Sequence, residues 1–193
     1  MTTALVAYGT TEGQTEKIAE RIVTELSERG HEARAMDVTE LPGDFSLDEY
    51  DAVLVGSSIH VGTHQQSVVD FVTANRTALA SRPTGFFQVS LSSAVEDDAR
   101  QAEAAEYVEA FVDQTNWHPD RIALFGGALR YSKYGFLKRL MLKRIAKDAT
   151  GDTDTSRDYE YTDWEEVAAF ANDFAAFVEG RLGESPGNGV VQR

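Results

Sequence analysis

Three short segments rich in Gly, Ser and Thr contain the side chains best suited to bind a small ligand. The first, Gly9–Thr15 (GTTEGQT), separates an apolar run from a helical pattern. It matches neither GxxxxGK[ST] nor GxGxxG, which disfavours a nucleoside triphosphate or a dinucleotide. A hydroxyl-rich turn at a helix start can instead bind one phosphate through backbone N–H groups, the helix dipole and its hydroxyls. The alternative is a plain cap, in which Thr11 caps the helix and Gln14 completes a capping box.

The other two segments follow later apolar runs. Gly56–His64 (GSSIHVGTH) comes after Ala52–Val55, and Ser90–Ala94 (SLSSA) ends the run Gly85–Leu91. Small residues let backbone N–H groups approach a flat ligand and donate to its ring heteroatoms. With the phosphate turn, these loops predict a site for a mononucleotide that carries a planar ring. The predicted binding residues are Thr10, Thr11, Glu12, Gly13, Gln14, Thr15, Ser57, Ser58, Ile59, His60, Val61, Gly62, Ser90, Leu91, Ser92, Ser93 and Ala94.

Two histidines in the second segment raise the question of a metal. His60 and His64 are four residues apart, but they straddle the expected junction of a loop and a helix. The chain has no Cys and offers no evident third ligand, so we predict no metal site. His60 is expected either to contact the ring edge or a substrate, or to lie exposed in its loop.

Strands and helices must position these segments, and the sequence shows strand-like and helix-like patterns in alternation. Strands are predicted over Ala4–Tyr8, His31–Val38, Tyr50–Ser57, Gly85–Leu91 and Arg121–Phe125, and helices over Gln14–Arg29, Gln65–Ser81, Asp98–Gln114 and Asp163–Leu182. Such alternation predicts an α/β fold with a doubly wound, five-stranded parallel sheet. Ligands of such sheets bind outside the carboxyl ends of the strands, where the three segments would meet. We expect one domain over residues 1–182, with an insertion over 130–158, and a disordered tail over 183–193.

Composition narrows the function further. The 193 residues carry a net charge of −14, which argues against nucleic-acid binding and suits a salty cytoplasm. Without Cys, thiol redox chemistry is excluded, so electron transfer would need a bound cofactor. The N-terminus has no signal-peptide pattern, and no apolar stretch has the about 18 residues of a spanning helix. The protein is therefore expected in the cytoplasm.

A basic segment interrupts the acidic background. Arg121–Lys147 contains eight basic residues and no Asp or Glu, which leaves −22 on the rest of the chain. Within it, Tyr134–Lys147 is amphipathic, and a basic amphipathic helix is typical of a membrane-surface or partner-binding element. The alternative is a helix packed on the acidic body by ordinary ion pairs. Residues predicted to attract substrate or an anionic membrane are Arg130, Tyr131, Lys138, Arg139, Lys143 and Lys147.

The turn Thr10–Thr15 resembles the FMN phosphate signature of the flavodoxin-like family, and the other two loops lie where that family places its ring-flanking loops. Phe125–Tyr131, Gly151–Thr155 and Tyr161–Glu165 further resemble the menaquinone-dependent protoporphyrinogen IX dehydrogenase branch. The resemblance runs through roughly residues 3–178. The sequence departs from the flavodoxin family in one respect, because that family usually flanks the flavin ring with aromatic residues. Here the third loop has no aromatic residue, and the second offers only His60 and Val61 beside the ring.

The resemblance implies a flavodoxin-like sheet of order 2-1-3-4-5 with FMN as cofactor. It implies oxidation of protoporphyrinogen IX to protoporphyrin IX in heme biosynthesis, with a membrane quinone as acceptor and with no catalytic side chain beyond the flavin. The protein would then be cytoplasmic or peripheral on the inner face of the cell membrane. Two alternatives remain open: an electron carrier or nicotinamide-dependent quinone reductase, and a non-catalytic module of the same fold. The oligomeric state does not follow from the sequence.

Overall fold

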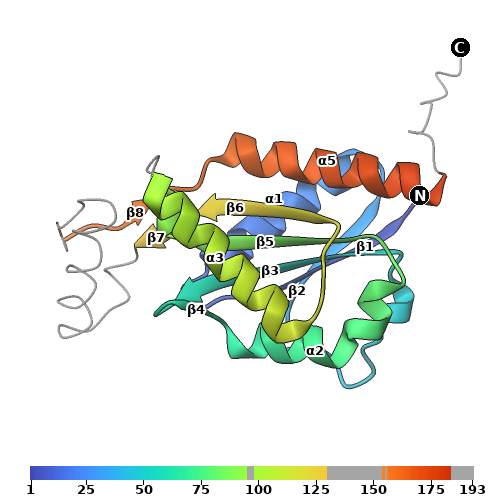
Figure 1. Cartoon of the computed structure of the whole chain (residues 1–193). Coiled ribbons are helices and arrows are strands. Elements are labelled where there is room, and N and C mark those ends of the chain that lie inside the picture. The colour runs from blue at the N-terminus through green and yellow to red at the C-terminus, as the bar shows by residue number, and fades with distance from the viewer. Residues whose placement is uncertain (95–97, 130–153, 155, 184–193) are drawn as a thin grey trace, which may run out of the picture.

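A parallel sheet forms the centre of the molecule (Figure 1). The computed structural model describes residues 1–94, 98–129, 154 and 156–183. The parallel strands are β1 (Thr3–Gly9), β2 (Glu32–Asp37), β3 (Ala52–His60), β5 (Thr84–Ser90) and β6 (Arg121–Gly126). They lie in the order β2-β1-β3-β5-β6, and all neighbouring pairs are parallel. The predicted doubly wound sheet of order 2-1-3-4-5 is thereby confirmed.

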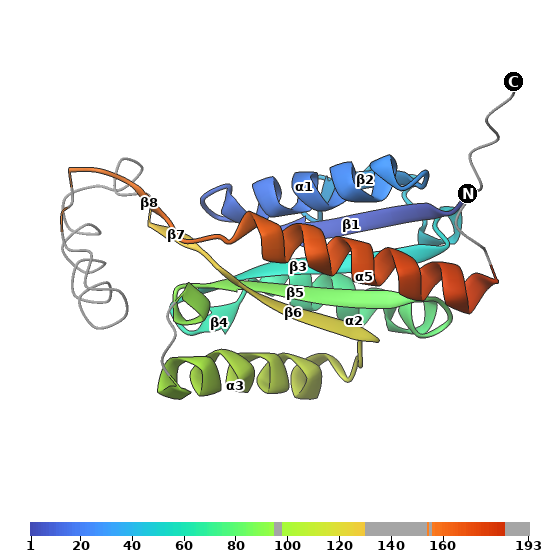
Figure 2. The ribbon, with the colours of Figure 1, turned by 90° about the horizontal axis from the view of Figure 1, so that it is seen from above.

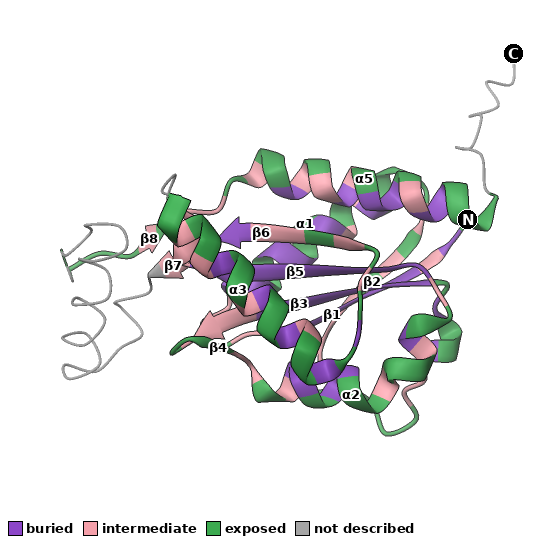
Figure 3. Cartoon of the chain, in the orientation of Figure 1, coloured by how far each residue is buried: buried purple, intermediate pink, exposed green. Residues whose placement is uncertain are grey.

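The helices in the described part of the chain cover the two faces of the sheet (Figure 2). The helices α1 (Gln14–Glu28) and α5 (Trp164–Leu182) pack on one face, and α2 (Gln66–Ala80) and α3 (Asp98–Thr115) on the other. Alternate residues of the strands therefore enter two separate cores. Burial is greatest in β1, β3 and β5, whereas the outer helix faces are exposed (Figure 3). This matches the continuous apolar runs that predicted fully buried strands.

Local residues fix where the helices begin and end. Gly30 adopts a φ of +93° directly after α1, as expected for a glycine that terminates a helix. Asp163 caps α5, because its Oδ1 accepts hydrogen bonds from the backbone N–H groups of Glu165 and Glu166 at 2.9 and 3.2 Å. These two signals fix the end of α1 and the start of α5.

Several short elements differ from the prediction. β3 continues to His60 and turns back into β4 (Thr63–His64), so part of the second segment is a hairpin and not a loop–helix junction. A small antiparallel ribbon pairs β7 (Ala128–Leu129) with β8 (Tyr159–Glu160). Short 3-10 turns occur at Leu47–Glu49 and Ser92–Ala94. Elements of two or three residues are too short to leave a periodic pattern.

Candidate functional site

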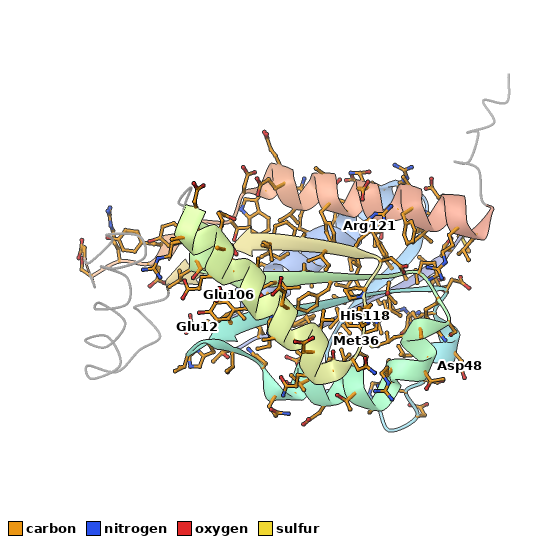
Figure 4. All side chains as sticks on the ribbon, viewed as in Figure 1. Glu12, Met36, Asp48, Glu106, His118 and Arg121 are labelled. Carbon is orange, nitrogen blue, oxygen red and sulfur yellow. The ribbon has the colours of Figure 1, made fainter. Side chains whose placement is uncertain are left out.

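The carboxyl ends of the parallel strands meet at one edge of the sheet, and the three predicted segments lie there. Glu12, in the first segment, lies at this end of the molecule, and Asp48 lies at the other (Figure 4). The segments are joined by side chains: the amide of Gln65 contacts both the first and the second. The backbone N–H of Gly127 donates to the carbonyl of Ser90 at 3.0 Å and fixes the third beside β6. The prediction that these segments share one edge is confirmed.

The first segment forms a turn that is not a side-chain cap. The N-cap position of α1 is Gly13, which has a φ of 89° and makes no side-chain cap. Thr10 Oγ1 accepts a hydrogen bond from the Gly13 N–H at 2.9 Å. The alternative in which Thr11 caps the helix with Gln14 is therefore wrong, because the helix starts at Gln14, three residues after Thr11, and its N-cap position is Gly13. The first turn of α1 is left without the side-chain oxygen that would occupy an anion's place.

Thr15 supplies the observation that decides whether a phosphate fits this turn. Its side chain is fully buried, yet its Oγ1 has no hydrogen-bond partner. A buried hydroxyl without a partner is unfavourable by about 1–3 kcal/mol, so a ligand that accepts its hydrogen bond would remove this penalty. The orphaned hydroxyl lies in the first turn of a helix, where N–H groups and the dipole attract anions. The turn therefore fits the phosphate of a mononucleotide.

Gln65, which precedes α2, joins the first two segments and was not predicted as a site residue. Its Nε2 donates to Thr11 Oγ1 at 2.9 Å and to Ser58 Oγ at 2.8 Å. Its backbone N–H donates to Ser57 Oγ at 3.3 Å. Glutamine at a helix start gives no sequence signal for such a bridge, because the two hydroxyls belong to distant segments.

The tip of the second segment presents apolar surface. Val61 is 74% exposed and has a φ of 51°, a conformation that is unfavourable for a β-branched residue. With Gly62 at a φ of 79°, it forms a two-residue hairpin turn between β3 and β4. Ile59 and His60, which pair with His64 and Thr63, are half-buried. The hairpin gives the predicted ring-binding loop a fixed backbone.

The hydroxyls of the third segment are held by the protein itself. Ser90 Oγ and Ser93 Oγ lie 2.7 Å apart, and Ser92 Oγ donates to Glu103 Oε2 at the same distance. The hydrogen bond from Ser92 lowers the pKa of Glu103, which keeps the carboxylate charged. The bond between the Ser90 and Ser93 hydroxyls uses only one of their two protons, so one proton of this pair remains for a ligand. The backbone N–H groups of Ser93 and Ala94 already donate to Ser90 Oγ and to the carbonyl of Leu91. Glu103 is a second supporting residue that the sequence did not reveal.

A second side-chain amide, that of Gln14, joins the first segment to the residues between β8 and α5. Gln14 Nε2 donates to Thr162 Oγ1 at 2.8 Å, and Thr162 Oγ1 donates to the carbonyl of Gly126 at 2.7 Å. A Cβ at Gly126 would lie 2.4 Å from the carbonyl oxygen of Tyr161, so this close approach requires glycine. The base of the β7–β8 ribbon is thereby fixed to the site.

The two histidines do not form a metal centre. The ring of His64 packs between Phe86 and Phe111, with centroids 5.5 and 4.7 Å away. Burial lowers the pKa of His64 to about 4, so the imidazole is neutral near pH 7. Among the described residues, no group of three or more His, Asp or Glu side chains is arranged to hold a metal ion. His64 is a core residue, and His60 alone remains near the site.

The structure does not describe the basic residues that the sequence singled out. Arg130, Tyr131, Lys138, Arg139, Lys143 and Lys147 all lie outside the described residues. Near the site, Lys17 pairs with Glu160 at 3.3 Å. Within the part of the chain that the structure describes, no helix is long and apolar enough to cross a membrane.

Fold and site together define a flavodoxin-type domain. A family model described as a flavodoxin domain matches residues 5–156. The chain is 37% identical over 171 residues to the protoporphyrinogen IX dehydrogenase (quinone) of Escherichia coli (strain K12), covering 89% of this chain and 93% of that protein. It is 34% identical over 174 residues to the enzyme of the same name from Leishmania major, covering 89% and 74%. The chain belongs to the flavodoxin-type family of these dehydrogenases.

Solved structures support the fold. A short-chain flavodoxin associated with a non-canonical PDU bacterial microcompartment has a TM-score of 0.57 at 15% identity, covering 96% of this chain and 100% of that one. A flavodoxin from the domain Archaea has a TM-score of 0.54 at 16% identity, covering 92% and 99%. Fold and family imply a flavin cofactor, and the phosphate turn fits one.

Proposed function

We propose that the chain binds FMN at the carboxyl end of its sheet. The observation that carries this proposal is the buried, unpartnered hydroxyl of Thr15 in the first turn of α1. A phosphate there would accept hydrogen bonds from Thr15 and from the hydroxyls of Thr10 and Thr11, with the helix dipole replacing a cationic side chain. The hairpin at Val61 and the segment Ser90–Ala94 would flank the ring.

We further propose that the protein oxidises protoporphyrinogen IX to protoporphyrin IX and reduces a quinone. The proposal is supported by the names of two relatives that match most of their length to this chain. Bound FMN supplies two-electron oxidation and reduction in such chemistry. The residues of the chain hold and orient the ring, and no described side chain needs to act as a nucleophile.

The protein's own groups have definable tasks in this function. Gly13 and Thr10 shape the phosphate turn, and the amides of Gln14 and Gln65 fix that turn to the neighbouring segments. Fixed segments hold the ring in one orientation, which lowers the entropic part of the reaction barrier. In the third segment the backbone N–H groups of Leu91 and Ser92 would donate to the polar edge of the ring, since those of Ser93 and Ala94 donate to Ser90 Oγ and to the Leu91 carbonyl.

The basic segment would bind the substrate or an anionic membrane surface. We propose that Arg130, Lys138 and Arg139 attract the carboxylates of a porphyrinogen or an anionic membrane surface, where a quinone is found. The remainder of the chain carries −22, so the basic segment is the part of the sequence whose net charge would attract an acidic substrate or an anionic surface. Each basic residue near an anionic membrane contributes about 1 kcal/mol of binding energy, less in high salt.

One pair of measurements tests the proposal. Purified protein should bind FMN and, under anaerobic conditions, should form porphyrin from protoporphyrinogen IX only when a menaquinone analogue is added. Protein that remains colourless with FMN would overturn the flavin site. Reduction of the bound flavin by a nicotinamide, with no porphyrin formed, would instead favour a quinone reductase.

A further inference from the structure

Gln65 commits both hydrogens of one amide nitrogen to the candidate site. Nε2 donates to Thr11 Oγ1 at 2.9 Å and to Ser58 Oγ at 2.8 Å. A side-chain amide nitrogen carries two hydrogens, so no donor remains for a ligand. Thr11 belongs to the phosphate turn and Ser58 to the ring-flanking hairpin. One side chain therefore fixes the distance between the two segments.

This arrangement also decides the direction of two hydroxyl protons. A hydroxyl has one proton to donate and two lone pairs to accept. Because each hydroxyl accepts from Gln65, its proton must point to another acceptor. Neither Thr11 Oγ1 nor Ser58 Oγ donates to another group within the described parts of the chain. Both are thus poised as donors, and a phosphate or a ring carbonyl is the complementary acceptor.

We infer that Gln65 is a positioning residue that turns the hydroxyl protons of Thr11 and Ser58 toward a phosphorylated flavin. The inference rests on the proposed FMN site. Thr11 then donates to the phosphate and Ser58 to the polar edge of the ring. The same polarity explains how a turn with no Lys or Arg holds an anion: its hydroxyls are kept as donors. A ligand that lacks the phosphate gains only half of this effect.

Replacing the amide by a carboxylate reverses the polarity. In Gln65→Glu both hydroxyls would donate to the new carboxylate, which can only accept. Their lone pairs would then face the phosphate, and a negative charge would lie beside it. We expect the dissociation constant of FMN to rise about 100-fold, because hydrogen bonds to a charged group are lost. Gln65→Leu leaves both hydroxyls free to rotate and should raise it only about 10-fold.

The adjacent residue provides a matched control. Gln66 is exposed, and its Nε2 donates to Asp70 Oδ1 at 2.8 Å, away from the site. Gln66→Glu introduces the same charge at the next position, the first residue of α2. FMN binding should stay within about two-fold of wild type, since the lost bond to Asp70 and the added charge are both exposed and point away from the site. Melting temperatures of the FMN-free variants show whether any loss of binding comes from loss of folding.

A double-mutant cycle tests the route through the hydroxyl. Thr11→Val keeps the side-chain shape without the hydroxyl, so Gln65→Glu should weaken FMN binding less in that background than in wild type. Riboflavin, which has no phosphate, should be affected less than FMN. Full additivity, or Gln65→Glu binding FMN as tightly as wild type, would refute the role of Gln65 alone. If wild-type protein binds no FMN, the proposed function fails together with this inference.

Discussion

The amide nitrogen of Gln14 lies 2.8 Å from the hydroxyl oxygen of Thr162, so residues 148 positions apart meet at the candidate phosphate site. The Thr162 hydroxyl in turn donates a hydrogen bond to the carbonyl of Gly126, the last residue of β6. The phosphate turn is therefore bonded to the point at which the chain leaves the sheet. Any ligand that orders the turn also orders the base of the β7–β8 ribbon.

Thr162→Val should test this link. The variant keeps the β-branched shape and removes two hydrogen bonds, so the free energy of unfolding should fall by about 1–2 kcal/mol. FMN affinity should fall as well, because Gln14 loses its anchor. Urea denaturation and flavin titration measure the two effects. Thr24→Val, which removes a hydroxyl bonded to the Glu20 carbonyl on the exposed side of α1, should leave flavin affinity unchanged. Equal flavin affinities for both variants would contradict the link.

The sequence predicted the sheet well because each buried strand is a continuous apolar run. Even the strand with polar ends, β6, was located to within one residue. The bridge from Gln65 was not predictable, because its partner Thr11 is 54 residues away and a lone Gln has many uses. The hairpin after β3 was missed for a different reason: Val at a positive φ contradicts local propensity. Tertiary contacts, not local patterns, determine both features.

Val61→Asn should make the protein more stable. Asn tolerates a positive φ, and Asn-Gly is the preferred sequence for this two-residue hairpin turn. Because Val61 is 74% exposed, little burial is lost, and the free energy of unfolding should rise by about 1 kcal/mol.

Retention of a strained, exposed valine suggests that its side chain touches the ring or the substrate. Val61→Asn should therefore weaken flavin or quinone binding while it stabilises the fold, as measured by titration and urea denaturation. Val61→Gly should also stabilise the fold, because it relieves the backbone strain, and should also weaken binding, because it removes the side chain. A variant with unchanged binding would show that the side chain has no role in the site.

Glu179 should control stability in acid. Its side chain is 6% exposed, and it accepts from Arg29 Nε and Nη2 at 2.6 and 2.8 Å and contacts His31 Nε2 at 3.0 Å. The hydrogen bonds from Arg29 hold the pKa of Glu179 at about 2, below its ordinary value of 4.5. A lowered carboxyl pKa stabilises the fold above pH 4.5, and this stabilisation is lost as the pH falls toward 2.

Glu179→Gln should therefore lower the free energy of unfolding by about 2 kcal/mol at pH 7, and by much less near pH 2.5. Denaturation in urea across this range gives the comparison. Asp173→Asn, on the same helix, removes an ion pair with Arg121 whose carboxylate is 64% exposed, so it should change little at any pH. A constant effect of Glu179→Gln at all pH values would exclude ionisation as its cause.

His64 should control the stability of the fold in a higher pH range than Glu179 does. Burial between Phe86 and Phe111 lowers its pKa from 6.5 to about 4. The folded state therefore binds this proton less readily than the unfolded chain. Stability is complete above about pH 6.5 and falls as the pH drops toward 4, by a total of about 3 kcal/mol.

His64→Leu should flatten the pH dependence of unfolding between pH 6.5 and 4, because it removes the buried imidazole whose protonation opposes folding in this range. Phe174→Leu, which opens the core on the other face of the sheet and does not touch His64, should lower stability equally at every pH. An NMR titration of the His64 ring in wild type should give a midpoint near 4. A midpoint near 6.5 would mean that the ring is solvated, and the hairpin that carries it would then not be fixed to the core.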